Sequence, residues 1–276
     1  MKKIILVFVT MLTICSMVSC AEDSSKRENE ISQILENFTI QYGLDEIPVP
    51  EIKVTSSKKI ESMSGIPGSN ATYRCDEKVI YVAKELNGDY AKEVLAHEVF
   101  HYINHYESEF QETYGFDFCI KNQPVGYFLT EGITQYFSEQ LYPLSERWAL
   151  YPRERLIGEQ LDIILDAKDY SLFDLFIHSN VDEMKRIFNE VAYESGLEDV
   201  ISVEGFKLTP FELLCLYIDI SSEAKLVGDQ SEFLVYTSLA ENEIYQMCVF
   251  LERENEYHQV VDKYVSKYGK NILGIG

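Results

Sequence analysis

The spacing of hydrophobic residues changes along this chain, and the change limits the folds open to it. Residues 51–55 alternate between polar and apolar positions as a strand does, and residues 71–74 and 79–82 flank a short polar turn. From residue 89 onward apolar residues recur at helical spacing, and we expect no strand after residue 106. The sequence therefore predicts an α+β fold in which a small mixed β-sheet lobe precedes an all-helical lobe.

Several helix boundaries are also predicted. An amphipathic helix begins near Ile31 and stops at Gly43, and residues 56–70 are expected to form a loop because they contain two glycines and a proline. Thr209 and Glu212 form the pattern of a capping box. The expected later helices span residues 89–106, 146–167, 181–194, 209–226, 231–253 and 257–268.

The first residues have the pattern of an export signal. Lys2 and Lys3 precede an apolar run over residues 4–14 that is too short to cross a bilayer with margin. Ser19 before Cys20 resembles the bacterial lipobox, in which the cysteine carries lipid after cleavage. We expect an extracytoplasmic protein held to a bacterial membrane through Cys20; the alternative is an ordinary secreted protein with an incidental cysteine.

These patterns divide the chain into four segments. Residues 1–20 are predicted to be the signal peptide, and the polar residues 21–30 a flexible tether. Residues 31–106 are expected to form the α+β lobe, and residues 107–276 the helical lobe.

The charge excludes one class of partner. Asp and Glu number 46 against 24 Lys and Arg, which gives a net charge of -22 at pH 7 and repels phosphate backbones. No nucleic-acid partner is expected, and no phosphate-binding glycine motif is present. The cysteines outside the signal form no C-x-x-C pair, and Cys215 and Cys248 are expected to be buried thiols.

The helix predicted over residues 89–106 contains an H-E-x-x-H sequence, whose side chains can bind a metal ion. His97 and His101 are one turn apart, about 6 Å along the helix axis, so both imidazoles can reach one ion. Glu98 is rotated by about 100° from His97, which directs its carboxylate toward a water molecule beside the metal. The pattern predicts one catalytic zinc ion with Glu98 as the general base.

Hydrolytic zinc needs a third protein ligand and an open position. His105 lies about 12 Å beyond His97 on a straight helix, out of reach of the same ion. Glu131 is the better candidate, because it lies opposite an apolar helical stripe that begins at Leu129. Gly132 beside it allows a neighbouring helix to approach closely.

With these two motifs the chain resembles the gluzincin peptidases, which combine H-E-x-x-H on one helix with a glutamate in an E-G-x-x-x-aromatic context on a second. The resemblance implies a zincin-like fold in which His97, His101 and Glu131 bind zinc and Glu98 is the general base. Members usually carry an acid four residues after the ligand glutamate, where this chain has Gln135. Gln135 and His105 are candidates for contacts that orient the ligands. The G-x-M-E-N signature of the aminopeptidase branch is absent.

These features predict a membrane-tethered zinc peptidase that cleaves peptides or proteins outside the cell. A substrate strand is expected to add to a free edge at residues 79–82. Two alternatives keep the same residues: hydrolysis of a non-protein amide such as a cell-wall peptide, and a non-catalytic lipoprotein that binds a partner on the same scaffold.

Overall fold

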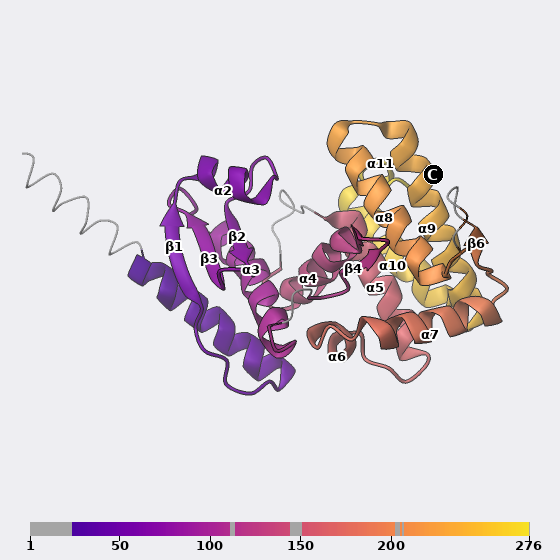
Figure 1. Cartoon of the computed structure of the whole chain (residues 1–276), viewed down its shortest axis with the longest axis horizontal. Coiled ribbons are helices and arrows are strands. Elements are labelled where there is room, and N and C mark those ends of the chain that lie inside the picture. The colour runs from indigo at the N-terminus through magenta and orange to yellow at the C-terminus, as the bar shows by residue number, and fades with distance from the viewer. Residues whose placement is uncertain (1–23, 111–113, 144–150, 202–204, 206, 276) are drawn as a thin grey trace, which may run out of the picture. The chain divides into compact units, whose positions relative to one another are not determined.

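The computed structural model describes residues 24–110, 114–143, 151–201, 205 and 207–275, and the fold is α+β (Figure 1). The chain divides into two compact units. One runs up to Ile103 and includes Leu141–Pro143; the other contains Asn104–Gln140 and the residues that follow Pro143.

The first unit is built on a three-stranded sheet in the order β1–β3–β2. β1 (Glu51–Thr55) is parallel to β3 (Val79–Ala83), and β2 (Ala71–Arg74) is antiparallel to it. All five residues of β3 are buried, as a central strand requires. The prediction that residues 79–82 form a free edge is therefore wrong, because β1 and β2 occupy both sides of β3.

Two helices of the first unit pack through aromatic rings. A helix over residues 24–42 meets α3 (Asp89–Glu107), and the ring centroids of Phe38 and Phe100 lie 5.3 Å apart. Residues 24–30, expected within a flexible tether, belong to this helix. Arg27 explains the difference, because its side chain is buried, pairs with Glu30 at 2.5 Å and donates to the carbonyl oxygen of Leu86. Cys20 and the predicted signal peptide lie outside the described residues.

The expected loop over residues 56–70 contains a helix, α2 (Ser57–Ser64). Only Ile60 of this helix is buried, and three of its eight residues are serines, so neither an apolar stripe nor helix propensity indicated it. Gly65 ends the helix in the left-handed conformation, with φ of 71°.

The second unit contains strands that the hydrophobic pattern did not predict. β4 (Phe118–Ile120) and β5 (Gln123–Val125) form an antiparallel hairpin, and β6 (Val200–Ile201) pairs with β7 (Lys207–Leu208). Pro124 lies inside β5 and removes a ladder donor, which is unusual in a strand. These strands are two or three residues long, too short to show alternation.

Helices make up most of this unit. The helices predicted over residues 181–194, 209–226, 231–253 and 257–268 are confirmed to within a few residues, and the capping box at Thr209 is present. The helix expected over residues 146–167 begins at Pro152 within the described part. The helices are α4 (Tyr127–Leu141), α5 (Pro152–Asp166), α6 (Leu172–Ile177), α7 (Val181–Glu194), α8 (Pro210–Val227), α9 (Gln230–Phe250), α10 (Glu254–Tyr268) and α11 (Lys270–Leu273).

A buried arginine joins three helices of this unit. Arg153 on α5 has no exposed surface and donates to the Ile218 carbonyl at 3.0 Å and the Ser222 hydroxyl at 2.6 Å, both on α8. It also donates to Thr237 on α9 at 2.9 Å and pairs with Glu154 at 2.9 Å. A buried charge is tolerated only when it is paired and hydrogen-bonded, so these contacts hold α5, α8 and α9 in one arrangement.

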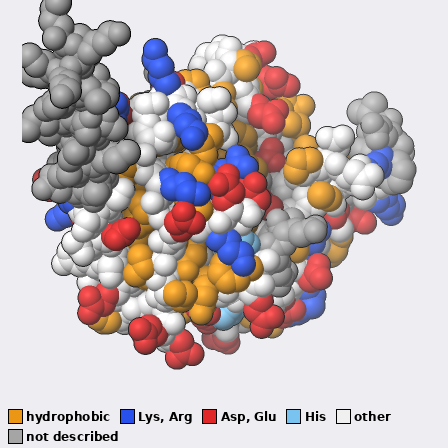
Figure 2. All heavy atoms as spheres, turned by 60° about the vertical axis from the view of Figure 1, so that its left-hand side comes forward, with side chains coloured by type: hydrophobic (Ala, Val, Ile, Leu, Met, Phe, Trp, Pro, Cys, Tyr) orange, Lys and Arg blue, Asp and Glu red, His pale blue; other side chains and the backbone are white. Residues whose placement is uncertain are grey.

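Charged side chains of both signs lie on the surface, and the described cysteines are free thiols. Acidic and basic side chains are interspersed over the face seen in Figure 2. Cys215 and Cys248 are buried thiols, as predicted, and none of the four described cysteines forms a disulfide. In the described part of the chain, no helix has the length and hydropathy needed to span a membrane.

A glycine lets α4 and α5 approach closely, as predicted. A Cβ atom at Gly132 would lie 2.4 Å from the carbonyl carbon and oxygen of Glu154. Backbone atoms cannot move aside as a flexible side chain can, so we expect Gly132→Ala to destabilise the fold by roughly 1–3 kcal/mol. Gly158→Ala is the matched control, because its Cβ would meet Ile133 Cγ1 at 3.2 Å, a side-chain atom. Urea unfolding measures both, and a Gly132→Ala protein as stable as the parent would contradict this packing.

A buried carboxyl predicts a pH-dependent stability. Glu243 on α9 is 9% exposed, and its Oε2 has no hydrogen-bond partner among the described residues. Burial raises its pKa from 4.5 to about 8, so the folded state binds more protons than the unfolded state between these values. This contribution to stability is present below pH 4.5 and is lost as the pH rises through 8.

We expect Glu243→Gln to be more stable than the parent at pH 9, by on the order of a few kcal/mol, and equally stable near pH 4. Urea unfolding at the two pH values measures the difference. Glu232→Gln, an exposed acid on the same helix, is the control. An equal effect of Glu243→Gln at both pH values would show that folding does not raise the pKa of this carboxyl.

Candidate metal centre

Helix α3 brings two histidine rings together. The Nε2 atoms of His97 and His101 are 3.0 Å apart, and the ring centroids are 4.7 Å apart with an angle of 80° between the planes. Both residues are buried, with 7% and 3% of their surface exposed. The one-turn spacing thus directs both nitrogens toward one point inside the protein.

Glu98, the next residue on α3, faces the sheet of the same unit. Its Oε2 accepts a hydrogen bond of 2.7 Å from the backbone N–H of Tyr73 on β2. The side chain is half-buried. A backbone donor on an edge strand therefore fixes the orientation of this carboxylate beside the histidine pair.

Helix α4 supplies the third side chain. Glu131 is buried, as are most residues of this helix. His97, His101 and Glu131 form a group of potential metal ligands, because each offers one ligand atom and these three atoms all lie within 4.8 Å of one another. His105, the ligand that the spacing argument rejected, is not in this group.

The three side chains fit a zinc ion. Two nitrogen ligands at about 2.0–2.1 Å from a tetrahedral zinc are separated by roughly 3.3 Å, close to the 3.0 Å found between the Nε2 atoms. Two imidazoles and a carboxylate match the ligand set of hydrolytic zinc sites, which keep a fourth position open. All three side chains are buried, and one cation could contact all of them because their ligand atoms lie so close together.

The start of α4 is held by two aspartates that the sequence analysis did not identify. Asp219 on α8 accepts the backbone N–H groups of Gly126 at 2.7 Å and Phe128 at 3.1 Å. Thr130 donates to Asp117 at 2.6 Å. Burial raises the pKa of Asp117 to about 7, and the charges of Glu131 and Asp219 act in the same direction. Neither aspartate lies in a motif, so no sequence signal marked it.

The structure describes one contact of each residue predicted to orient the ligands. Gln135, one turn after Glu131, is buried and donates to Glu139 Oε1 at 3.0 Å. The His105 ring is buried near the end of α3, with its centroid 4.9 Å from that of Phe110.

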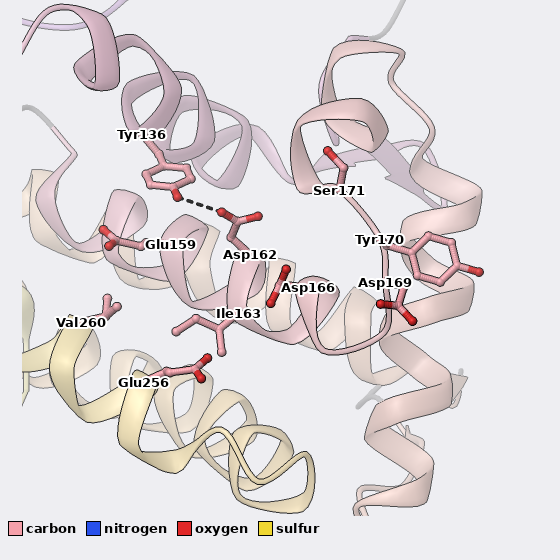
Figure 3. A pocket seen from close by; sticks show the side chains of 10 residues that line it. All are labelled: Tyr136, Glu159, Asp162, Ile163, Asp166, Asp169, Tyr170, Ser171, Glu256 and Val260. Carbon is pink, nitrogen blue, oxygen red and sulfur yellow. Dashed lines mark hydrogen bonds between the residues drawn. The ribbon is translucent and has the colours of Figure 1, made fainter. Parts of the chain in front are cut away.

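An acidic cavity of about 650 Å³ lies in the second unit (Figure 3). The Tyr136 hydroxyl donates to Asp162 Oδ2 at 2.8 Å at its wall. None of its residues belongs to the group of potential metal ligands. The cavity is lined by Tyr136, Glu159, Asp162, Ile163, Asp166, Asp169, Tyr170, Ser171, Glu256 and Val260.

Comparison with known proteins assigns no family to the chain. No protein-family model, no curated protein and no solved structure was found to match it.

The geometry predicts metal binding that depends on all three side chains. We expect the chain without its first twenty residues to bind one equivalent of zinc. His97→Ala and His101→Ala should abolish stoichiometric binding, and Glu131→Ala should weaken it at least 10-fold, because each removes one ligand atom. Competition with a chromophoric chelator measures the affinity. His258→Ala is the control, because His258 is exposed on α10. Unchanged affinity in Glu131→Ala would remove this residue from the site.

Proposed function

We propose that the chain is a zinc-dependent peptidase of the gluzincin type. The observation that carries the proposal is the buried group of His97, His101 and Glu131, whose ligand atoms lie within 4.8 Å of one another. The α+β fold is compatible with the zincin fold that the motifs imply. His97, His101 and Glu131 would hold the ion, and Glu98 would act beside it.

Glu98 is proposed as the general base. A bound zinc ion supplies Lewis acidity, which acidifies water and polarises a carbonyl oxygen. Glu98 takes the proton of the attacking water and passes it to the leaving amine, so one carboxylate serves both halves of the hydrolysis. Its bond from the Tyr73 N–H holds Oε2 in one orientation, which supports this role because a base must be positioned before it can act.

The outer edge of β2 is proposed to bind the substrate main chain. The Asn70 carbonyl accepts the Ala83 N–H at 2.8 Å, so even-numbered residues of this segment face β3. The main-chain groups of Ala71 and Tyr73 consequently point away from β3, consistent with the Tyr73 N–H meeting Glu98. The Tyr73 N–H is bonded to Glu98 and the Ala71 carbonyl accepts the Ser69 hydroxyl at 2.8 Å. A peptide bound antiparallel to β2 beside Glu98 would therefore displace Ser69 and leave the bond to Glu98 in place.

The proposed enzyme works outside the cell. The charged start, the short apolar run and Ser19 before Cys20 support export and lipid attachment at Cys20 to a bacterial membrane. Peptides or proteins in that compartment are the proposed substrates.

The general-base role predicts a separation of binding from catalysis. We expect Glu98→Gln to keep the zinc affinity of the parent and to lose hydrolysis of a peptide library by about 100-fold or more, because the amide cannot accept the proton. Digestion followed by mass spectrometry measures the loss, with a chelator-treated sample as the baseline. Glu107→Gln, the same change at the end of α3, is the control and should keep full activity.

Two outcomes would contradict the proposal. Chelator-sensitive hydrolysis that survives in Glu98→Gln would remove the base assignment. A parent protein that binds zinc and cleaves no peptide in the library would reject the peptidase.

A further inference from the structure

The carboxylate of Asp219 caps the helix that carries Glu131. Its Oδ2 accepts the Gly126 N–H at 2.7 Å and its Oδ1 accepts the Phe128 N–H at 3.1 Å, so both oxygens are bound to the start of α4. The first N–H groups of a helix lack partners within the helix, and its N-terminus carries partial positive charge. A carboxylate satisfies both requirements, and this one comes from α8, far along the chain.

Glu131 is close enough to this cap to depend on it. Phe128 precedes Glu131 by three residues, less than one helical turn. Thr130 next to Glu131 also accepts the Phe116 N–H at 3.0 Å, and Gly132 lies against the α5 backbone. The cap fixes where the helix begins, and these contacts fix its rotation, so together they determine where the carboxylate of Glu131 projects.

Asp219 is itself held in place. The residue before it, Ile218, accepts a hydrogen bond of 3.0 Å from the buried guanidinium of Arg153. Asp219 also lies in the middle of the long helix α8, whose backbone is fully formed there. The cap is therefore built on a rigid element and can transmit its position to α4.

We infer that Asp219 is a positioning residue for the metal centre: by holding the first turn of α4, its carboxylate places Glu131 for zinc binding. The inference rests on the proposed function, because it assumes that Glu131 is a ligand. Asp219 takes no part in the ligand set itself.

The test compares zinc affinity with stability in capping variants of the whole chain. We expect Asp219→Ala to raise the zinc Kd by about 100-fold and Asp219→Asn by about 10-fold, because asparagine keeps one acceptor oxygen. The absorption spectrum of the cobalt(II)-loaded protein, which reports ligand geometry, should change in the same order. Asp229→Ala is the matched control. Asp229 accepts the Glu232 N–H at 3.0 Å and caps α9 instead.

Each outcome decides between the hypotheses. The inference is supported if the unfolding midpoint falls by a comparable amount in Asp219→Ala and Asp229→Ala while zinc binding weakens only in Asp219→Ala. If Asp219→Ala does not fold, the 10-fold effect and altered cobalt spectrum of Asp219→Asn support it, and parental values in that variant overturn it. If His97→Ala abolishes zinc binding but both Asp219 variants bind zinc as tightly as the parent, the inference is overturned. The proposed function then stays intact. A parent that binds no zinc overturns both.

Discussion

The candidate centre depends on the burial of two imidazoles that face each other one helical turn apart. Their Nε2 atoms lie 3.0 Å apart with almost no exposure to water. A buried carboxylate lies within the same 4.8 Å group as the two rings. Two imidazoles and a carboxylate form a ligand set that zinc uses in proteins, so this group could hold a metal ion.

Several contacts of the second unit hold α4 and its neighbouring helices in place. Arg153 joins α5 to α8 and α9, Gly132 allows α4 to lie against the α5 backbone, and Asp219 caps α4 from α8. Gly132 and Asp219 act on α4 directly, and Arg153 holds together the helices α5 and α8 from which these contacts come. Metal sites require ligands held to within a fraction of an ångström, so a dense polar framework around one short helix is consistent with a binding function.

The parts of this structure that could be predicted from the sequence are those set by local spacing. The helix with His97 and His101, the later helix with Glu131 and the strand pair around residues 71–83 all follow from periodicity or turn composition. Strand order could not be predicted in this way, because β1 pairs with β3 across a long connection. The short hairpin at Pro124, the helix α2 and the burial of Arg27 depend on tertiary contacts that outweigh local preference. Asp219 caps a helix that lies far from it in the sequence, and only the folded chain reveals that contact.

X-ray absorption at the zinc edge of the zinc-loaded protein can identify the atoms bound to the ion. We expect two imidazole nitrogens and a carboxylate oxygen at about 2.0–2.2 Å, with the more distant scattering that histidine rings produce. Sulfur at about 2.3 Å, or a spectrum without histidine scattering, would place the metal away from His97, His101 and Glu131.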